Sequence, residues 1–220
     1  MKKATAEFIG TFALVFCGTG AIVIDKVSGG AIGHIGIALT FGLIVLAMIY
    51  ALGDISGAHI NPAVTIAFTI AGRINKKDAL PYIISQLLGA FLASLCIRLL
   101  FMRSPTLGET MPAGSQMQSF ILETLLTFLL MFVVMVVSSG AKEKGIPAGM
   151  IIASVVGLEA MFAGPICGAS MNPARSIAPA IVSCNLEIIK TQWLYIAGPI
   201  IGACVAVWIY KYIYSQTLNP

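Results

Sequence analysis

The chain has very few charged side chains for its length. Only 10% of its 220 residues are Asp, Glu, Lys or Arg, whereas soluble domains carry roughly 25%. Hydrophobic residues make up 58%, and the mean hydropathy is +0.95. This composition indicates an integral membrane protein, and six spans of about 20 residues would use up most of the chain. Since no room remains for a folded catalytic module, we expect a protein that is not an enzyme.

The sequence also lacks the residue patterns of metal, cofactor and nucleic-acid sites. Its five cysteines do not have the spacing of metal ligands and mostly lie in apolar runs, where cysteine usually acts as a small buried side chain. No pairing of a nucleophile with a base appears, and no basic patch is interleaved with aromatic residues. We therefore expect no catalytic residue, no metal, no cofactor and no nucleic-acid partner, and attribute the net charge of +4 to membrane orientation.

What the chain does contain is a series of apolar runs. The first one includes Glu7 and is not followed by a small-residue cleavage site, so we interpret it as a membrane span and not as a signal peptide. Two other runs, at about 62–71 and 173–182, are too short to cross a bilayer. The six runs of spanning length lie near 5–24, 32–52, 79–101, 118–138, 147–165 and 191–214.

The tripeptide Asn-Pro-Ala occurs twice, each time at the start of one of the short runs. Asn is a good helix N-cap, and Pro is favoured at the first helical position. Each copy therefore predicts a short helix, and in a membrane protein the pair is typical of two half-helices whose N-termini meet at mid-depth. The six residues are Asn61, Pro62, Ala63, Asn172, Pro173 and Ala174.

The sequence around these tripeptides is repeated as well. Residues 57–65 match residues 168–176, and Glu7 and Glu123 lie in similar stretches near the start of each half. Because each half holds three spans, an odd number, the second half has to insert upside down relative to the first. We expect a single transmembrane domain over 1–220, made of inverted repeats at about 1–103 and 116–220 that are joined by an extracellular loop at about 103–117.

Basic residues cluster in alternate loops. The positive-inside rule then places both termini in the cytoplasm and the loop between the halves outside. The short tails and the lack of organelle-targeting signals favour a plasma membrane, specifically a prokaryotic inner membrane. The clustered basic residues are Lys2, Lys3, Arg73, Lys76, Lys77, Lys142, Lys144 and Lys211.

Together, the paired tripeptides, the opening stretch at 6–12 and Arg175 directly after the second tripeptide resemble the major intrinsic proteins, the aquaporin superfamily. Stretches 57–68 and 163–172 look most like the plant nodulin-like intrinsic proteins and their microbial relatives. The resemblance covers nearly the whole chain. It implies an all-α membrane protein with six transmembrane helices and two re-entrant half-helices, which forms a homotetramer with one pore per protomer in the lipid bilayer.

The resemblance also implies a passive channel whose centre excludes protons and ions. A helix N-terminus carries roughly half a positive charge, and two such ends facing each other oppose cations. Asn61 and Asn172 can each cap a helix while pointing an amide N–H into the pore. The oxygen of a passing water or hydroxyl group then accepts a hydrogen bond from both, which hinders a proton-conducting chain of waters.

The family places its narrowest ring at four positions, and here these correspond to Phe41, Ala160, Ala169 and Arg175. Strict water channels usually have His at the position of Ala160, so the two alanines imply a wider and more apolar ring. Nodulin-like channels often carry Trp at the position of Phe41, so the ring departs from theirs too. We expect water and small uncharged solutes to pass: glycerol, urea, and boric or arsenous acid. The alternatives are a strict water channel and, more remotely, a secondary transporter.

Five further polar residues are candidates for supporting roles. In the family, the acids corresponding to Glu7 and Glu123 brace the re-entrant loops by accepting backbone N–H groups, as non-helical backbone in a membrane requires. Glu159 either faces the vestibule or accepts bonds from nearby loop backbone. His59 and Asp54 are expected near the cytoplasmic mouth.

Overall fold

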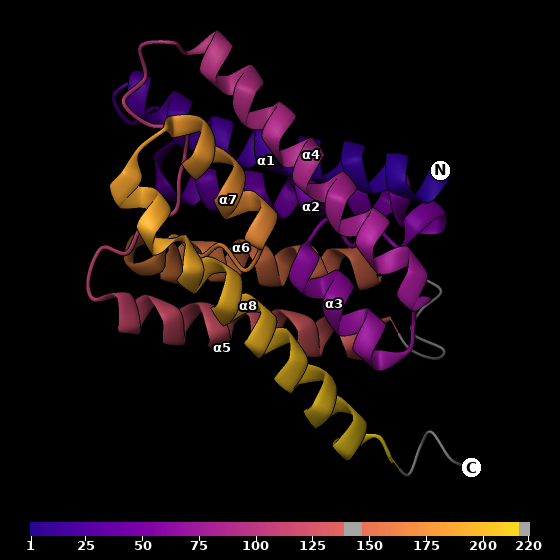
Figure 1. The fold of residues 1–220 in the computed structure, drawn as a ribbon. Coiled ribbons are helices and arrows are strands. Elements are labelled where there is room, and N and C mark those ends of the chain that lie inside the picture. Colours follow the sequence, from indigo (N-terminus) through magenta and orange to yellow (C-terminus); the bar gives the residue numbers. More distant parts are fainter. Residues whose placement is uncertain (139–146, 216–220) are drawn as a thin grey trace.

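The structure is a computed structural model and describes residues 1–138 and 147–215. Within those residues the chain forms α-helices and no strand, as the family resemblance implies (Figure 1). The helices are α1 (Lys2–Val27), α2 (Gly33–Ser56), α3 (Pro62–Ala71), α4 (Lys76–Leu100), α5 (Gln116–Val137), α6 (Pro147–Cys167), α7 (Pro173–Ser183) and α8 (Leu186–Ile213).

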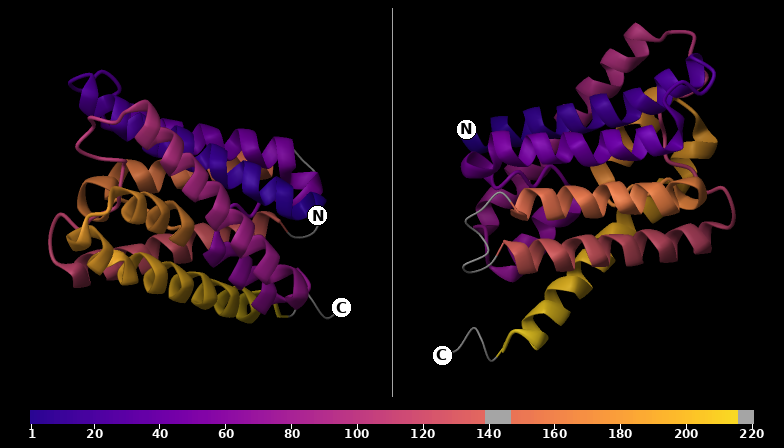
Figure 2. Two further views of the ribbon diagram at one scale, coloured as in Figure 1. Left: turned by 45° about the horizontal axis from the view of Figure 1, so that its top comes forward. Right: turned by 180° about the vertical axis from the view of Figure 1, so that it is seen from behind.

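Six of these helices are long and apolar enough to cross a membrane, in agreement with the six predicted spans. Three of them, α4, α5 and α8, begin before the predicted apolar runs, and in each a side chain caps the first turn. The clearest case is α8, which begins five residues before the predicted run, where the Asn185 side chain accepts a hydrogen bond from the backbone N–H of Glu187. Figure 2 shows α4 and α8 tilted against the other four long helices.

The two short helices begin as their sequences predict. Asn61 and Asn172 are the N-caps of α3 and α7, and a proline follows each at the first helical position. The helix α3 lies at one end of the bundle and α7 lies at the other (Figure 1).

Packing between the long helices is close at equivalent glycines in the two halves. A Cβ atom on Gly89 would lie 2.3 Å from the carbonyl oxygen of Phe8, and one on Gly202 would lie 2.1 Å from that of Thr124. Both distances are too short for any side chain, so α1 and α4 in one half, and α5 and α8 in the other, approach with their backbones nearly in contact. The largest single contact between the two halves is that of α2 with α6.

A proline near the end of α6 ties this helix to α2. Pro165 has no N–H and leaves the carbonyl oxygen of Met161, four residues earlier, without its helical donor. His34 at the start of α2 supplies a replacement, with its Nε2 2.5 Å from that oxygen. The bond fixes the part of α6 that carries Ala160.

Both ends of the fold lie on one side of the bundle. The start of α1 and the ends of α3 and α8 share a side that we call the inner side, and the 101–115 loop lies on the opposite, outer side (Figure 1). Most of the clustered basic residues belong to inner segments; Lys142 and Lys144 fall outside the described residues.

A candidate pore at the meeting of the half-helices

The loops that lead into α3 and α7 have the same unusual backbone. Ala58 and Ile60 have φ angles of 45° and 44°, and the equivalent residues Ala169 and Met171 have 41° and 54°. Non-glycine residues rarely adopt this left-handed region, and they persist there only when their surroundings hold them. The repeat in the sequence therefore builds the same strained loop twice.

Glu7 holds the first loop in place. Its Oε1 accepts hydrogen bonds from Ser56 Oγ (2.7 Å) and the backbone N–H of His59 (2.9 Å). Its Oε2 accepts from the backbone N–H of Ile60 and from Gln86 Nε2, both at 2.7 Å. The carboxylate is fully buried, so it satisfies backbone donors that would otherwise be stranded in an apolar surrounding.

Glu123 makes the equivalent contacts to the second loop. Its two oxygens accept from the backbone N–H groups of Ser170 and Met171, each at 2.8 Å. Each carboxylate therefore accepts backbone N–H groups from the loop that leads into one half-helix.

The two asparagines cross-link the loops. Asn61 Nδ2 donates to the carbonyl oxygen of Met171 (2.7 Å), and Asn172 Nδ2 donates to that of Ile60 (2.8 Å). Each side-chain oxygen meanwhile accepts from its own half-helix, so the amide plane is fixed at both ends. One N–H of each amide is used across the loops, and the other remains for the cavity that both side chains line.

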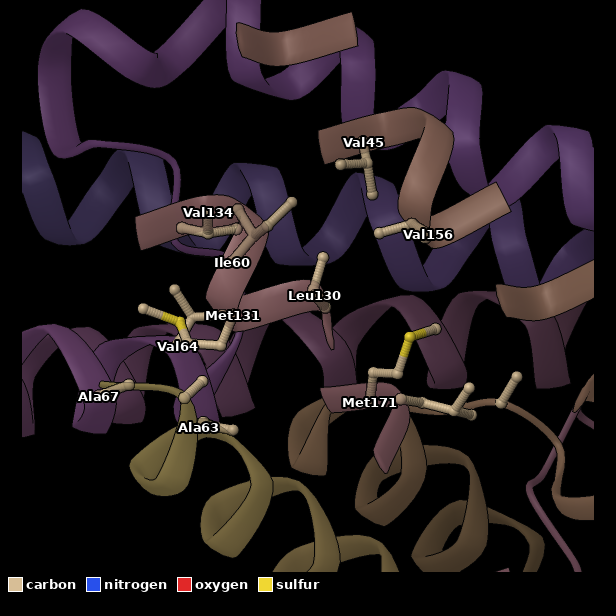
Figure 3. Close-up of a cluster of buried hydrophobic side chains, with 14 of the residues drawn as sticks. Val45, Ile60, Ala63, Val64, Ala67, Leu130, Met131, Val134, Val156 and Met171 are labelled. Carbon is tan, nitrogen blue, oxygen red and sulfur yellow. The ribbon is translucent and has the colours of Figure 1, made fainter. Parts of the chain in front are cut away.

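This cavity passes between the halves and is lined by both asparagines and by all four residues of the expected ring. Between these polar points its wall is apolar. Figure 3 shows part of that wall, where side chains from α2, α5, α6 and the first loop lie near one another. The lining residues labelled there include Val45, Ile60, Leu130, Val134 and Val156.

Two of the expected ring residues, Arg175 and Phe41, are in contact, and Arg175 also binds the 101–115 loop. Arg175 is 2% exposed, its guanidinium carbon lies 5.1 Å from the centroid of the Phe41 ring, and its Nη1 donates to the carbonyl oxygen of Gly108 (2.8 Å). An arginine in a membrane needs such partners. Ala160 and Ala169 complete the lining with methyl groups only.

The carbonyl that binds Arg175 is presented by a turn which the sequence alone did not reveal. Glu109 Oε2 accepts from Thr106 Oγ1 and from the backbone N–H of Leu107 (2.9 Å). The N–H of Gly108 donates to Thr106 Oγ1 (3.0 Å). The sequence predicts only a connecting loop here. The single sequence signal was a glycine followed by an acid, which does not say that the loop folds inward.

Both predicted roles of Glu159 are wrong. It does not line the cavity, and its side chain is only 1% exposed, so it is not a vestibule residue. Within the described residues neither of its oxygens has a hydrogen-bond partner, so it does not brace loop backbone either. The helical turn that points Ala160 into the pore directs its neighbour Glu159 into the packed interior.

His59 and Asp54 lie at a second cavity, on the inner side. Asp54 is exposed there, whereas His59 is buried and borders both cavities. The His59 ring lies 4.7 Å from that of Phe68 and 5.0 Å from that of Tyr82, measured between centroids. Its Nδ1 is 3.1 Å from Thr65 Oγ1. These contacts fix the ring where the two cavities adjoin.

Comparison with known proteins identifies the relatives of this chain. Residues 1–210 match the model of the major intrinsic protein family. Aquaporin NIP1-1 of Zea mays is 43% identical over 97% of this chain and 75% of its own length, and Aquaporin NIP3-1 of Arabidopsis thaliana is 40% identical over 100% and 72%. The X-ray structure of the aquaglyceroporin from Plasmodium falciparum has a TM-score of 0.87 at 26% identity and covers 99% of this chain and 98% of its own.

Proposed function

The chain belongs to the major intrinsic protein family, and we propose that its pore conducts water together with small uncharged solutes, glycerol and urea first among them. The relatives are named as aquaporins, so the chain is a passive channel and not an enzyme. The observation that carries the solute range is the pair of methyl groups, Ala160 and Ala169, in the ring that Phe41 and Arg175 complete.

The ring can select among solutes because one side of it carries the Arg175 guanidinium and the other side is apolar. The guanidinium of Arg175 is held by Gly108 and lies against Phe41, so its donors are fixed before a solute arrives. The hydroxyl oxygens of a polyol can accept hydrogen bonds from those donors, while its C–H groups lie against the apolar side of the ring. Because Ala160 and Ala169 end at Cβ, they leave space that a larger side chain would fill.

Ion and proton exclusion arises at the asparagines and at the ring. The N-termini of α3 and α7 face each other across the cavity, and each adds partial positive charge. The free N–H groups of Asn61 and Asn172 bind the oxygen of a passing water, which turns both its hydrogens away from the centre. Protons therefore cannot pass along a continuous chain of hydrogen-bonded waters through the pore. Arg175 adds a permanent positive charge that opposes cations.

Boric and arsenous acid extend the same argument. Both are small, uncharged hydroxides at neutral pH, and each presents hydroxyl oxygens to the fixed donors of Arg175. The NIP names of the relatives agree with the nodulin-like resemblance of the sequence, which supports a broad solute range.

We further infer that the chain is one domain of two inverted repeats, at about 1–103 and 116–220. It would lie in the plasma membrane of a prokaryote with both termini cytoplasmic, and assemble as a homotetramer with a pore in each protomer. The matching φ angles of the two loops support the repeat. The basic residues at the inner side support the orientation, and family resemblance supports the tetramer.

The test is stopped-flow light scattering on proteoliposomes, with osmotic water flux and glycerol uptake measured on the same preparation. We expect both to exceed those of empty vesicles, and Arg175→Ala to change their ratio. Fast water flux without glycerol uptake would instead identify a strict water channel. Flux of neither would overturn the assignment of the cavity as the pore.

A further inference from the structure

We infer that Gly18, a buried residue of α1 that does not itself line the cavity, determines the width of the ring by giving Phe41 the space it occupies. The inference deepens the proposed function, since it assigns a specificity-determining residue to the same ring. It rests on one close approach between two helices.

The ring of Phe41 lies where a side chain of residue 18 would be. A Cβ atom on Gly18 would be 2.2 Å from Phe41 Cε1, 2.5 Å from Cζ and 2.6 Å from Cδ1. Carbon atoms in contact prefer separations of about 3.5–4.0 Å. One edge of the phenyl ring is therefore seated directly on the backbone of α1.

The opposite side of the same ring faces the pore. Phe41 lines the cavity, and the guanidinium carbon of Arg175 lies 5.1 Å from its centroid. A methyl group at position 18 would have to displace the ring, because α1 is packed closely against α2 and α4 and the ring is the movable partner. The displacement would carry the ring away from α1, toward the cavity and Arg175, and so narrow the passage.

The corresponding pair in the second half divides the same space more evenly. Counted from Glu7 and Glu123, position 18 corresponds to Val134; counted from the tripeptides, Phe41 corresponds to Ile152. Both counterparts line the cavity. Where the first half combines no side chain with a phenyl ring, the second combines valine with isoleucine, which is the complementarity expected if the two positions share one space.

A glycine two residues further along provides a matched control. Gly20 is also buried in α1, but a Cβ atom there would meet only Ile97 Cδ1, at 3.9 Å, an ordinary contact. Gly20→Ala makes the same chemical change in the same helix and leaves Phe41 untouched. Any general effect of replacing a helical glycine by alanine is therefore shared by both variants.

The experiment compares wild type, Gly18→Ala and Gly20→Ala in proteoliposomes, with glycerol and water permeability measured per protein molecule. We expect the ratio of glycerol to water permeability to fall by about tenfold in Gly18→Ala, the scale of one methyl group in a tight apolar site. We expect it to stay at the wild-type value in Gly20→Ala. Equal ratios in the two variants would overturn the inference.

A second substitution separates narrowing from misfolding. Phe41→Leu in the Gly18→Ala background should restore most of the ratio, because the shorter side chain frees the space that the methyl group needs; Phe41→Leu alone completes the cycle. A folding defect would lower both permeabilities together and would not be rescued. If wild type carries water but no glycerol, the broad solute range fails, and the inference is then decided by water flux, which must fall in Gly18→Ala and not in Gly20→Ala.

Discussion

The outer and inner halves of the cavity are built on two loops with matching backbone conformations but are lined by different side chains. An offset of 111 residues relates the two tripeptides, and it maps each residue of the outer ring to a counterpart that also lines the cavity. The outer ring combines a charged and an aromatic residue with two alanines, whereas the inner positions are all aliphatic. The outer residues are Phe41, Ala160, Ala169 and Arg175, and their counterparts, in the same order, are Ile152, Ile49, Ala58 and Val64.

Under the proposed function, discrimination between solutes depends on side chains and on one loop, because the loops of the two halves have matching backbone conformations. The loop backbones agree to within about 10° in φ at equivalent left-handed residues. Arg175 has partners because the outer loop brings the Gly108 carbonyl to it. Its inner counterpart Val64 is apolar and requires none.

The largest expected effect comes from removing a brace common to both halves. Glu7→Ala would strand two side-chain donors and the N–H groups of His59 and Ile60, whereas Glu123→Ala would strand the N–H groups of Ser170 and Met171. Each unpaired buried donor costs about 1–3 kcal/mol. We therefore expect both variants to lose folded yield and Tm in detergent, with Glu7→Ala the worse; the reverse order would contradict this account.

The next largest effect tests the difference in charge between the outer ring and its inner counterparts. Arg175→Ala removes the permanent positive charge of the outer ring, so we expect proton leakage into dye-loaded vesicles to rise about tenfold or more if charge is a main barrier. Val64→Ala, the equivalent inner change, should leave leakage at the wild-type level. Equal leakage from the two variants would place the barrier entirely at the asparagines.

Narrowing the outer ring tests its placement. Ala160→His adds a bulky polar side chain where strict water channels have one, and we expect glycerol flux to fall by about tenfold while water flux falls less. Stopped-flow light scattering of osmotic water flux and of glycerol uptake gives the glycerol-to-water ratio. An equal fall in both fluxes, or no change in either, would mean that the narrowest point lies elsewhere.

The smallest effect is expected from the turn that presents the Gly108 carbonyl. Glu109→Gln keeps the shape of the side chain but weakens the bonds to Thr106 and Leu107, so Arg175 should become less well fixed. We expect a roughly two- to fivefold change in the glycerol-to-water ratio, since a neutral acceptor makes weaker bonds than a carboxylate. The control is Glu187→Gln, an exposed acid paired with Lys190, whose loss should change nothing.

Features that depend on nearby residues were predictable from the sequence. The Asn-Pro pair caps and starts a helix by contacts within three residues, so both half-helices were placed to within one residue. The six spans followed from run length, and the family from the repeated motif. Glu159 was misplaced because its direction depends on how α6 is rotated against its neighbours, which a run of apolar residues leaves undetermined.

The sequence by itself determined the helices of the described residues, the repeated motifs and the residues available to line a pore, because capping and run length act over a few residues. Only the tertiary structure decided how the ring is formed. The seating of Phe41 on Gly18, the turn at Glu109 that reaches Arg175, and the crossing bonds of Asn61 and Asn172 join segments far apart in the chain. Such contacts arise from the packing of whole helices, and no local pattern of residues encodes them.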